Sequence, residues 1–307
     1  MEINELKAFT EVAEAASFSL AAERLFLTQP AVSKRVAALE GKLGTRLFDR
    51  IGHRIRLTEA GRQLLPRARA LLLEMADIQR SINRLSGVIS GTLRMGTSHH
   101  IGLRRLPPVL KAFSRQFPAV TLDIRFMDSE SACAAVEQGD LELAIVTLPP
   151  ASPGKLVLRE IWHDRLRFVV AADHPLARRE GRITLSDLAG YPAVLAARGT
   201  YTRGILEQAL APLDLELQVG MATNYLETLK MMVSIGLGWS LLPESMIEGP
   251  ELRALDLQEM RLSRSLGFVT HGSRVLSNAG QKMLDTCLHH ADPASTQEES
   301  GLRPGSF

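Results

Sequence analysis

The feature that most constrains this chain is a row of apolar residues between positions 64 and 89. They recur at alternating intervals of four and three, and they are Leu64, Ala68, Leu71, Met75, Ile78, Ile82, Leu85 and Ile89. The core helix of a single globule rarely keeps so regular a heptad seam. The seam therefore predicts a helix over 58–89 that packs against its copy in a second subunit. At about 1.5 Å per residue this helix would be roughly 45 Å long.

The two ends of the chain differ in charge more than the net total of +2 indicates. Residues 1–87 carry 14 Lys+Arg and 10 Asp+Glu, a net +4, whereas the other 220 residues carry 22 and 24, a net −2. Between Thr28 and Arg69 there are ten basic residues and three acidic ones. Such a basic module suits contact with a polyanion, although charge alone favours an ordinary solvated surface.

Two short helices are predicted at the start of the chain. Apolar residues at helical spacing indicate a first helix that ends near Ala16. These residues are Ile3, Leu6, Phe9 and Ala13. Ser19 is the expected N-cap of a second helix, whose inner face carries Ala22 and Leu25.

A third predicted helix begins at Thr28, a good N-cap, with Pro30 in the first turn, where its missing N–H costs nothing. The apolar back of this helix consists of Val32, Val36, Leu39 and Leu43. Its front presents amide, hydroxyl and cationic groups near the N-terminal end, and these belong to Gln29, Ser33 and Lys34, with Arg35 on one flank. Two short helices joined by a tight turn, the second bearing such groups, have the layout of a helix-turn-helix that reads a DNA major groove.

The next segment, RLFDRIGHRIRLTEAG, predicts a wing. Ile55 and Leu57 alternate with Arg54 and Arg56, which indicates a short strand with one basic face. Wing arginines contact phosphates or the neighbouring minor groove, so they add affinity more than sequence choice. Thr58 is then the expected cap of the long helix.

From Thr92 onward, short β-rich runs alternate with helical segments, which predicts α/β layers with mostly parallel sheets. The expected strands are TLRMGT, VTLDIRF, LELAIV, RLRFVVAA and GWSLL. The expected helices lie near 101–117, 129–139, 201–211, 224–235 and 277–290. Pro107 and Pro108 should bend or interrupt the first of them. The polar stretch 292–307, rich in Ser, Pro and Gly, is expected to be a disordered tail.

The sequence lacks the motifs that are typical of several classes of protein. No run of 18 apolar residues occurs, and the N-terminal MEINELKAFTEVAE has acids where a signal peptide needs a basic flank, so a cytoplasmic protein without membrane contact is expected. The only cysteines, Cys133 and Cys287, lack the spacing of a zinc site or a disulfide framework, although one regulatory disulfide stays open. No Walker loop, GxGxxG, nucleophile elbow or H-E-x-x-H is present, so we expect no enzyme, no catalytic residue, no metal site and no cofactor.

The stretch SFSLAAERLFLTQPAVSKRVAALEGKLGTRLFDR, followed by RLTEAG, resembles the signature of LysR-type transcriptional regulators, and the resemblance extends over the whole chain. It implies an α+β multidomain fold. Its parts would be a winged helix-turn-helix at 1–58, a linker and dimerisation helix at 59–91 and an effector-binding domain at 92–291. The effector-binding domain would be similar to type 2 periplasmic binding proteins. Its two α/β subdomains would be 92–163 with 267–290, and 164–266.

The same resemblance implies a set of DNA contacts on the third helix and the wing. The residues are Thr28, Gln29, Pro30, Ser33, Lys34, Arg50 and Arg54. Gln29 and Ser33 are assigned to base edges and the cationic residues mainly to phosphates, while Pro30 equally fits a purely structural role. The implied partners are double-stranded DNA with an imperfect palindrome, a second copy in a dimer that pairs again into a tetramer, and RNA polymerase.

A small-molecule effector is expected in the cleft between the two subdomains, at strand ends and helix N-termini. The strand TLRMG runs into two hydroxyls and two imidazoles, and the family pattern adds Thr147, the segment 198–202 and Asn224. The expected effector residues are Thr97, Ser98, His99, His100, Thr147, Thr200, Thr202 and Asn224. Ser and Thr donors without an obvious bidentate Arg favour a small oxyanion or compact carboxylate over a large aromatic ligand.

The TSHH segment is similar to that of sulfur-assimilation regulators of the family, although Ile101 stands where those often have a polar amide. This likeness implies a sulfite- or sulfate-like effector. Alternatives stay open: the His pair as a solvated turn, Thr200 and Thr202 as helix caps, and Cys133 as a core residue. Two other functions also stay open, a redox sensor using Cys133 and Cys287 and a solute-binding protein. The helix-turn-helix and the missing export signal disfavour the second of these.

Overall fold

The computed structural model describes residues 1–292 except 52, 53, 86, 180, 214, 216, 258 and 259. Its chain divides into two units, Met1–Ser86 and Gly87–Phe307. The predicted tail, apart from its first residue, lies outside the described residues. No helix of the described part is both long and apolar enough to cross a membrane.

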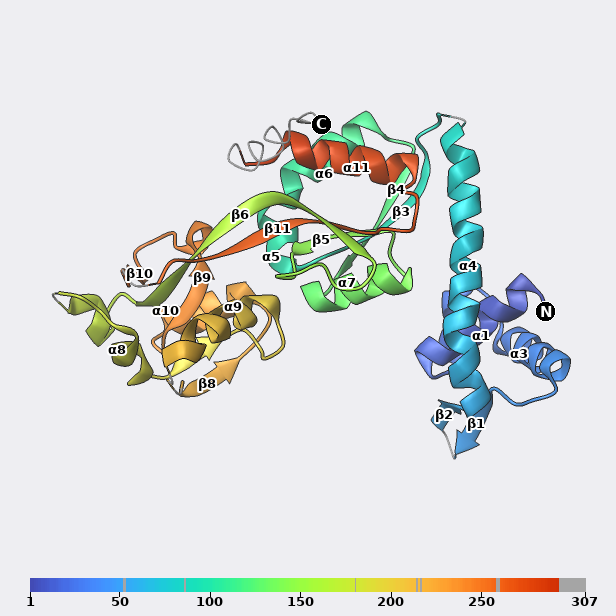
Figure 1. The fold of residues 1–307 in the computed structure, drawn as a ribbon, viewed down its shortest axis with the longest axis horizontal. Coiled ribbons are helices and arrows are strands. Elements are labelled where there is room, and N and C mark those ends of the chain that lie inside the picture. Colours follow the sequence, from blue (N-terminus) through green and yellow to red (C-terminus); the bar gives the residue numbers. More distant parts are fainter. Residues whose placement is uncertain are drawn as a thin grey trace, which may run out of the picture. The chain divides into compact units, whose positions relative to one another are not determined.

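The first unit packs its helices and a two-stranded hairpin around an apolar core (Figure 1). The elements are α1 (Ile3–Ala15), α2 (Phe18–Arg24), α3 (Gln29–Leu43), β1 (Phe48–Ile51), β2 (Arg54–Leu57) and α4 (Glu59–Leu85). The ring of Phe48, from the hairpin, contacts the rings of Phe9 and Phe18 from two different helices. The wing is therefore tied to the helices by aromatic packing, not only by the chain.

The start of α3 agrees with the sequence prediction. The Thr28 hydroxyl accepts a hydrogen bond from the Ala31 amide at 3.4 Å, and Pro30 lies in the first turn. The apolar back is buried at Val32, Val36 and Leu39. The fourth predicted member, Leu43, is instead 41% exposed, because the helix ends at Gly44 and its last turn extends past the core.

The start of α2 differs from the prediction. Its N-cap is Ser17, whose hydroxyl accepts from the Leu20 amide at 3.2 Å, so the assignment of Ser19 as the cap was wrong. Beginning the helix at Phe18 places that ring in the core. The first helix ends at Ala15, as the apolar spacing predicted.

The long helix α4 is the element predicted from the heptad seam. It begins after Thr58, whose hydroxyl accepts from the Gly61 amide at 3.0 Å, and it spans 27 residues. The prediction that it continues through Ile89 was wrong. Gly87 has a φ of +66°, a value that favours glycine and is incompatible with an α-helix, and Ile89 packs instead against the core of the second unit.

The second unit is built on a seven-stranded sheet. The strands in this unit are β3 (Gly91–Thr97), β4 (Val120–Phe126), β5 (Leu143–Thr147), β6 (Leu156–Ala171), β7 (Ala193–Leu195), β8 (Val219–Ala222), β9 (Ser240–Pro243), β10 (Leu252–Leu255) and β11 (Leu262–His271). The sheet order is β10–β6–β11–β5–β3–β4, with β9 also paired to β6, while β7 and β8 form a separate pair. The prediction of mostly parallel sheets was wrong, because the long strands β6 and β11 pair antiparallel with each other and with every other neighbour.

Helices cover both faces of this sheet, with α6 and α11 on one face and α7 on the other (Figure 1). The helices are α5 (His99–Arg104), α6 (Leu106–Gln116), α7 (Ser129–Gln138), α8 (Leu185–Ala189), α9 (Tyr201–Leu210), α10 (Leu226–Ser234) and α11 (Asn278–His289). Short 3-10 turns lie at Pro175–Arg178, Ala211–Leu213 and Glu244–Met246. The break between α5 and α6 confirms the interruption expected from Pro107 and Pro108, which lie in the first turn of α6.

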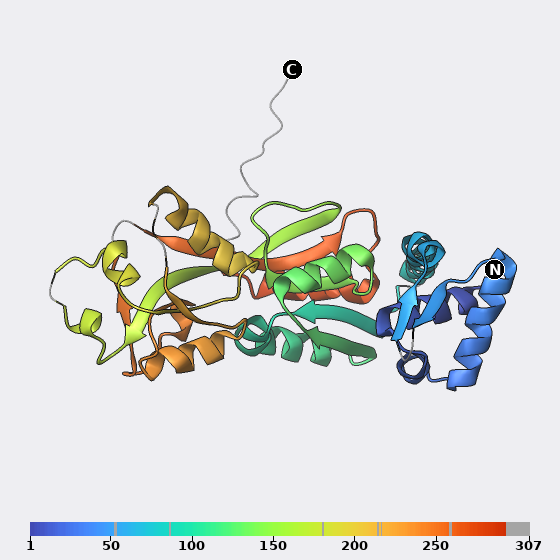
Figure 2. The ribbon, with the colours of Figure 1, turned by 90° about the horizontal axis from the view of Figure 1, so that it is seen from below.

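Separate apolar cores divide the second unit into two lobes (Figure 2). Along β6 the side chains change from one core to the other between Trp162 and Leu166, and along β11 between Leu266 and Leu262. We call 87–162 with 266–292 the first lobe, and 166–262 the second lobe. The two long strands run side by side through both lobes, so the chain crosses between them twice (Figure 1).

Candidate functional site

The N-terminal part of α3 presents an exposed polar face. Thr28, Gln29, Pro30 and Lys34 are exposed and Ser33 is half-buried, while the back of the same helix is buried. The Gln29 side-chain amide donates a hydrogen bond to the Ser33 hydroxyl at 3.0 Å, one helical turn away. This pair offers both donors and acceptors from a rigid helix, which is what recognition of base edges requires.

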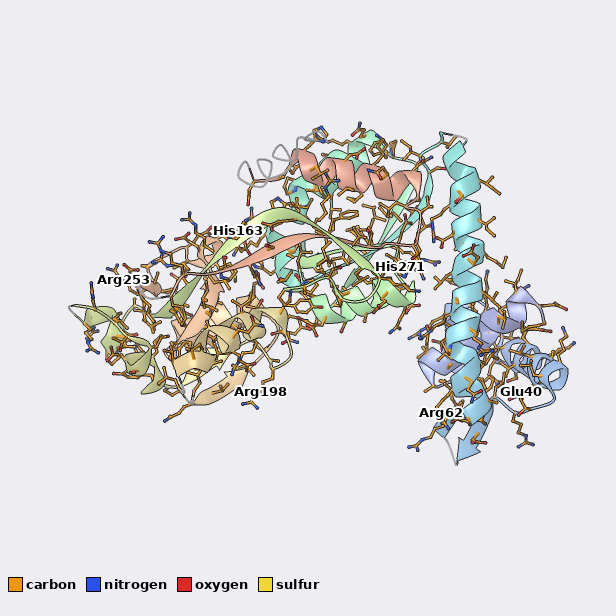
Figure 3. All side chains as sticks on the ribbon, in the orientation of Figure 1. Glu40, Arg62, His163, Arg198, Arg253 and His271 are labelled. Atoms are coloured by element: carbon orange, nitrogen blue, oxygen red, sulfur yellow. The ribbon has the colours of Figure 1, made fainter. Side chains whose placement is uncertain are left out.

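Glu40 of α3 positions the start of the wing (Figure 3). One carboxylate oxygen accepts from the backbone amides of Leu47 and Phe48, at 2.7 and 3.3 Å. On the other side of the hairpin, Arg62 of α4 donates to the Leu57 carbonyl at 2.9 Å. The hairpin is therefore braced from two helices.

The structure places the backbone of the predicted wing arginines in the paired strands. Arg50 lies opposite Ile55 and Arg54 lies opposite Ile51. The side chains of both arginines lie outside the described part, so their predicted phosphate contacts stay predictions. On the described part of the wing, Arg56 is exposed, as the alternation with Ile55 predicted.

In the second unit, the predicted effector residues converge on a cavity of about 50 Å³. It is lined by Ser98, His99, His100, Met127, Asp128, Ser129, Glu130, Thr147, Ala196, Thr200, Thr202, Asn224, Leu226 and Arg264. The lining comes from both lobes and from the crossing strand β11. On the scale at which one water needs about 10–15 Å³, the cavity has room for roughly three to five water-sized groups.

The structure brings all the predicted effector residues but one to this cavity, the exception being Thr97. Thr97 is fully buried, and its hydroxyl donates to the Ile145 carbonyl of the neighbouring strand at 2.8 Å. Thr97 therefore stabilises the sheet and does not line the cavity. The sequence alone did not distinguish its role from that of Ser98 beside it.

The hydroxyls of Thr200 and Thr202 have different partners. Thr200 caps α9, because its oxygen accepts from the Arg203 amide at 3.2 Å and its proton goes to the Ala197 carbonyl at 2.9 Å. The Thr202 oxygen accepts from Arg264 at 3.1 Å, so its own proton is left to be donated. The alternative interpretation as a helix cap therefore describes Thr200 and not Thr202.

A buried ionic cluster lies where the strands cross between lobes. Asp164 and Arg264 stand opposite each other on β6 and β11, with the guanidinium Nη2 2.9 Å from the carboxylate. Arg105 approaches the other carboxylate oxygen at 3.0 Å. Burial by itself raises the pKa of Asp164, but the neighbouring His100, Arg264 and Arg105 outweigh it and hold that pKa far below its usual range.

His100 adds an imidazole to the same cluster. It is only 4% exposed, and its two ring nitrogens lie 3.7 Å from Asp164 and 3.6 Å from Glu227. Both distances exceed a good hydrogen bond, and neither nitrogen has a hydrogen-bond partner among the described residues. Two buried polar nitrogens at the wall of a cavity indicate a polar occupant, either water or a ligand.

Direct contacts across the cleft join the two lobes. The Glu130 carboxylate of α7 accepts a hydrogen bond from the backbone amide of Tyr201, the first residue of α9. The Tyr201 ring packs against the first-lobe core that includes Ala132 and Cys133. The second lobe therefore reaches into the first beside the cavity.

Sequence reasoning missed several residues of the cavity, above all Arg264 and Glu130. The signal for Arg264 was available, because it keeps the alternating spacing of Leu262, Leu266 and Phe268 and so falls on the same side of the strand as these apolar residues. Asp164 has the same relation to Trp162 and Leu166 on β6. Glu130 gave no such signal, since only the tertiary fold brings it to α9. By contrast, Arg198 of the predicted segment is exposed and lies outside the cavity lining (Figure 3).

Both units match known family models. Residues 3–62 match the model described as a bacterial regulatory helix-turn-helix protein of the lysR family, and residues 86–292 match the LysR substrate binding domain. The chain belongs to the LysR family of transcriptional regulators. Among its relatives, the uncharacterized HTH-type transcriptional regulator YeiE of Escherichia coli strain K12 is 34% identical over 299 residues, which cover 95% of this chain and 98% of YeiE.

Solved structures share the fold of this LysR regulator. A full-length OxyR variant from Pseudomonas aeruginosa superposes with a TM-score of 0.68 at 22% identity, covering 94% of this chain and 98% of that one. Full-length CbnR in complex with its target DNA gives a TM-score of 0.62 at 22% identity, with coverage of 95% and 99%. At these identities the likeness establishes the fold alone.

The two cysteines of this LysR regulator are both buried free thiols in different cores. Burial raises the pKa of Cys133 to about 11 and that of Cys287 to about 12. The thiolate is the form that reacts with oxidants, so both groups are poorly suited to redox sensing.

Proposed function

We propose that this LysR regulator binds an imperfect palindrome in double-stranded DNA through α3 and the wing, and that a small anion in the cleft of the second unit changes this binding. The proposal rests chiefly on the exposed Gln29–Ser33 pair at the start of a helix whose back is buried. As a partner of DNA, the protein would act in the cytoplasm. The protein would act by binding and not by catalysis.

The proposed dimer uses the apolar seam of α4. Leu64 and Ala68 pack inside the first unit, whereas Leu71, Met75, Ile78 and Ile82 are between 43% and 61% exposed. We therefore propose that these four large apolar side chains, which lie on one stripe of the helix, are buried against the same helix of a second subunit. At about 1.5 Å per residue the 27-residue helix is roughly 40 Å long. Pairing of such dimers into a tetramer and contact with RNA polymerase belong to the same proposal.

The proposed effector is a small oxyanion or compact carboxylate, such as sulfite or sulfate. A ligand of about five heavy atoms suits the roughly 50 Å³ cavity. Thr202, His100 and Asn224 line this cavity. The Asn224 side-chain oxygen already accepts from the Ala197 amide at 3.2 Å, so its NH2 group is the part that can donate to a ligand. The buried thiols disfavour the alternative of a redox sensor based on Cys133 and Cys287.

DNA binding is tested with a labelled fragment of the region upstream of the protein's own coding sequence. A retarded complex that survives excess random DNA is expected, and its absence at all protein concentrations would contradict the proposal.

The dimer is tested by sedimentation of Ile78→Glu, with Glu74→Gln as a control on the same helix. We expect Ile78→Glu to shift the protein toward monomer and the control to sediment as wild type.

The effector is tested by thermal unfolding in the presence of sulfite, sulfate, thiosulfate, phosphate and small carboxylates. A ligand at one hundred times its dissociation constant stabilises the folded state by about 2.7 kcal/mol, which raises the unfolding midpoint visibly. A shift that disappears in Thr202→Ala would connect the ligand with the cavity. No shift with any of these anions would overturn the proposed ligand class while leaving DNA binding in place.

A further inference from the structure

The N-terminus of α9 already holds a negative charge from the opposite lobe. The Glu130 carboxylate accepts the amide proton of Tyr201, which has no partner within its own helix. Figures 1 and 2 both show the start of α9 next to α7. A carboxylate at this end of a ten-residue helix also interacts favourably with the helix dipole. Glu130 therefore occupies the position that an anionic ligand of this helix would take.

A second feature of the same cavity indicates a further polar occupant. His100 is 4% exposed and lines the cavity, and neither of its ring nitrogens has a hydrogen-bond partner among the described residues. The Thr202 hydroxyl proton also remains to be donated, because its oxygen accepts from Arg264. Glu130 thus covers one donor of the cavity. The Thr202 hydroxyl still has a proton to donate, and the His100 ring nitrogens, 3.7 and 3.6 Å from the Asp164 and Glu227 carboxylates, lie beyond hydrogen-bond distance of them.

The charges at the cavity make an added anion dependent on Glu130. Arg264 is the buried cation of the lining, but its charge is matched by Asp164 at 2.9 Å. Asp128 and Glu130 add two carboxylates to the lining, and both would repel an incoming anion. Movement of the Glu130 side chain out of the cavity would remove one of these negative charges and would at the same time expose the Tyr201 amide.

We infer that Glu130 is an internal competitor of the effector, so that an oxyanion binds at α9 by displacing the Glu130 carboxylate from the Tyr201 amide. This inference rests on the proposed oxyanion effector. It makes Glu130 a specificity-determining residue. An anion of higher charge, with several acceptor oxygens, can replace the carboxylate and also reach His100 and Thr202. A weakly accepting monovalent anion cannot. Displacement also breaks one bond between the lobes, which couples occupancy of the cavity to lobe packing.

The test is calorimetric titration of the full-length protein with sodium sulfate, and separately with sodium sulfite. Glu130→Gln keeps an oxygen that can accept from Tyr201 but removes the charge, and Glu130→Ala removes both. The control is Glu137→Gln, which removes a charge from an exposed position of the same helix outside the cavity lining. We expect the dissociation constant to fall about tenfold in Glu130→Ala, by less in Glu130→Gln, and not to change in the control.

Thermal unfolding of each variant verifies that it is folded before titration. Unchanged or weaker sulfate binding by both folded Glu130 variants, with measurable binding by the wild type, would overturn the competitor role alone. Binding by Glu130→Ala but not by the wild type would support it strongly. No binding of either anion by any variant would overturn the oxyanion effector itself, and the competitor role with it.

Discussion

The DNA-reading face of α3 and the effector cavity are both polar, but they are built in opposite ways. The first lies within seven consecutive positions of one exposed helix, and its side-chain hydrogen bonds are local, such as that between Gln29 and Ser33. The second gathers residues from Ser98 to Arg264 and rests on a buried ionic cluster. Substitutions on α3 should therefore change DNA recognition without changing the stability of the fold. Substitutions in the ionic cluster beside the cavity should lower stability, because these groups also hold the two lobes together.

The largest expected effect is on Asp164→Asn. Asp164 is 3% exposed and Arg264 is 5% exposed, so the substitution leaves a buried guanidinium without its counter-charge. We expect the free energy of unfolding of the second unit to fall by about 3–5 kcal/mol. Urea unfolding followed by tryptophan fluorescence measures it, because both tryptophans of the chain, Trp162 and Trp239, are buried in this unit.

Asp123→Asn is the matched control for Asp164→Asn. Its carboxylate is 39% exposed and lies 3.8 Å from the Arg94 guanidinium. An exposed pair of this kind contributes less than about 1 kcal/mol. Similar losses of unfolding free energy in the two variants would mean that the buried cluster contributes no more to stability than a surface ion pair. The proposed difference between the α3 face and the cavity would then be wrong.

The second prediction concerns the pH dependence of the Asp164 contribution. Burial raises the pKa of Asp164, but the neighbouring His100, Arg264 and Arg105 outweigh it, so the folded-state pKa is depressed. A depressed carboxyl pKa gives stability that is fully present above the unfolded value of about 3.9 and is lost as the pH falls toward the folded value. The difference in unfolding free energy between wild type and Asp164→Asn should shrink as the pH falls below about 4. A difference that grew as the pH fell below that value would contradict this assignment.

The third prediction tests whether α3 recognises sequence independently of stability. Gln29→Ala or Ser33→Ala should weaken binding to the cognate site by about 1–3 kcal/mol and reduce discrimination against random DNA. Arg54→Ala should weaken cognate and random binding together and reduce the salt dependence of affinity. Fluorescence anisotropy at several salt concentrations measures both. The same behaviour for the two classes of variant would show that the division between base and phosphate contacts is wrong.

The smallest expected effect is at the turn before α3. Phe26 has a φ of +54° and a side chain that is 95% exposed, so it carries backbone strain without packing in return. Phe26→Asn should raise the unfolding free energy of the first unit by about 0.5–1 kcal/mol, since Asn adopts this conformation more readily. Ala16→Gly, at a φ of +47°, is the parallel case on α1. Thermal unfolding measures both, and a loss of stability in Phe26→Asn would mean that the phenyl ring makes contacts that offset the strain.

The sequence predicted local features well and pairings poorly. The cap at Thr28 and the break at Pro107 depend on backbone chemistry within one turn, and both were predicted correctly. Ser17 and Ser19 are equally good caps by type, and the burial of Phe18 decides between them. The antiparallel pairing of β6 with β11 joins residues about 100 positions apart, so no local pattern could predict it.

The candidate sites follow the same division. The polar face of α3 was predicted from spacing because a helix places neighbours three and four positions apart on one side. The resemblance to the family supplied the assignment of its residues to DNA. At the cavity, a row of polar residues such as Thr97 and Ser98 gave no sign of which side chain faces the sheet and which the cleft. Alternation in β11 contained the information for Arg264, whereas Glu130 reaches α9 only when the two lobes meet.

The sequence by itself determined the helix-turn-helix with its polar face, the apolar seam of α4 and the alternation of strands and helices, because each depends on side chains within a few turns of one another. Only the tertiary structure decided the cavity. Burial makes Asp164 and Arg264 depend on each other for their charged forms, and the meeting of the two lobes brings the Glu130 carboxylate to the Tyr201 amide. Burial and long-range charge depend on everything that surrounds a residue, which its position in the sequence does not specify.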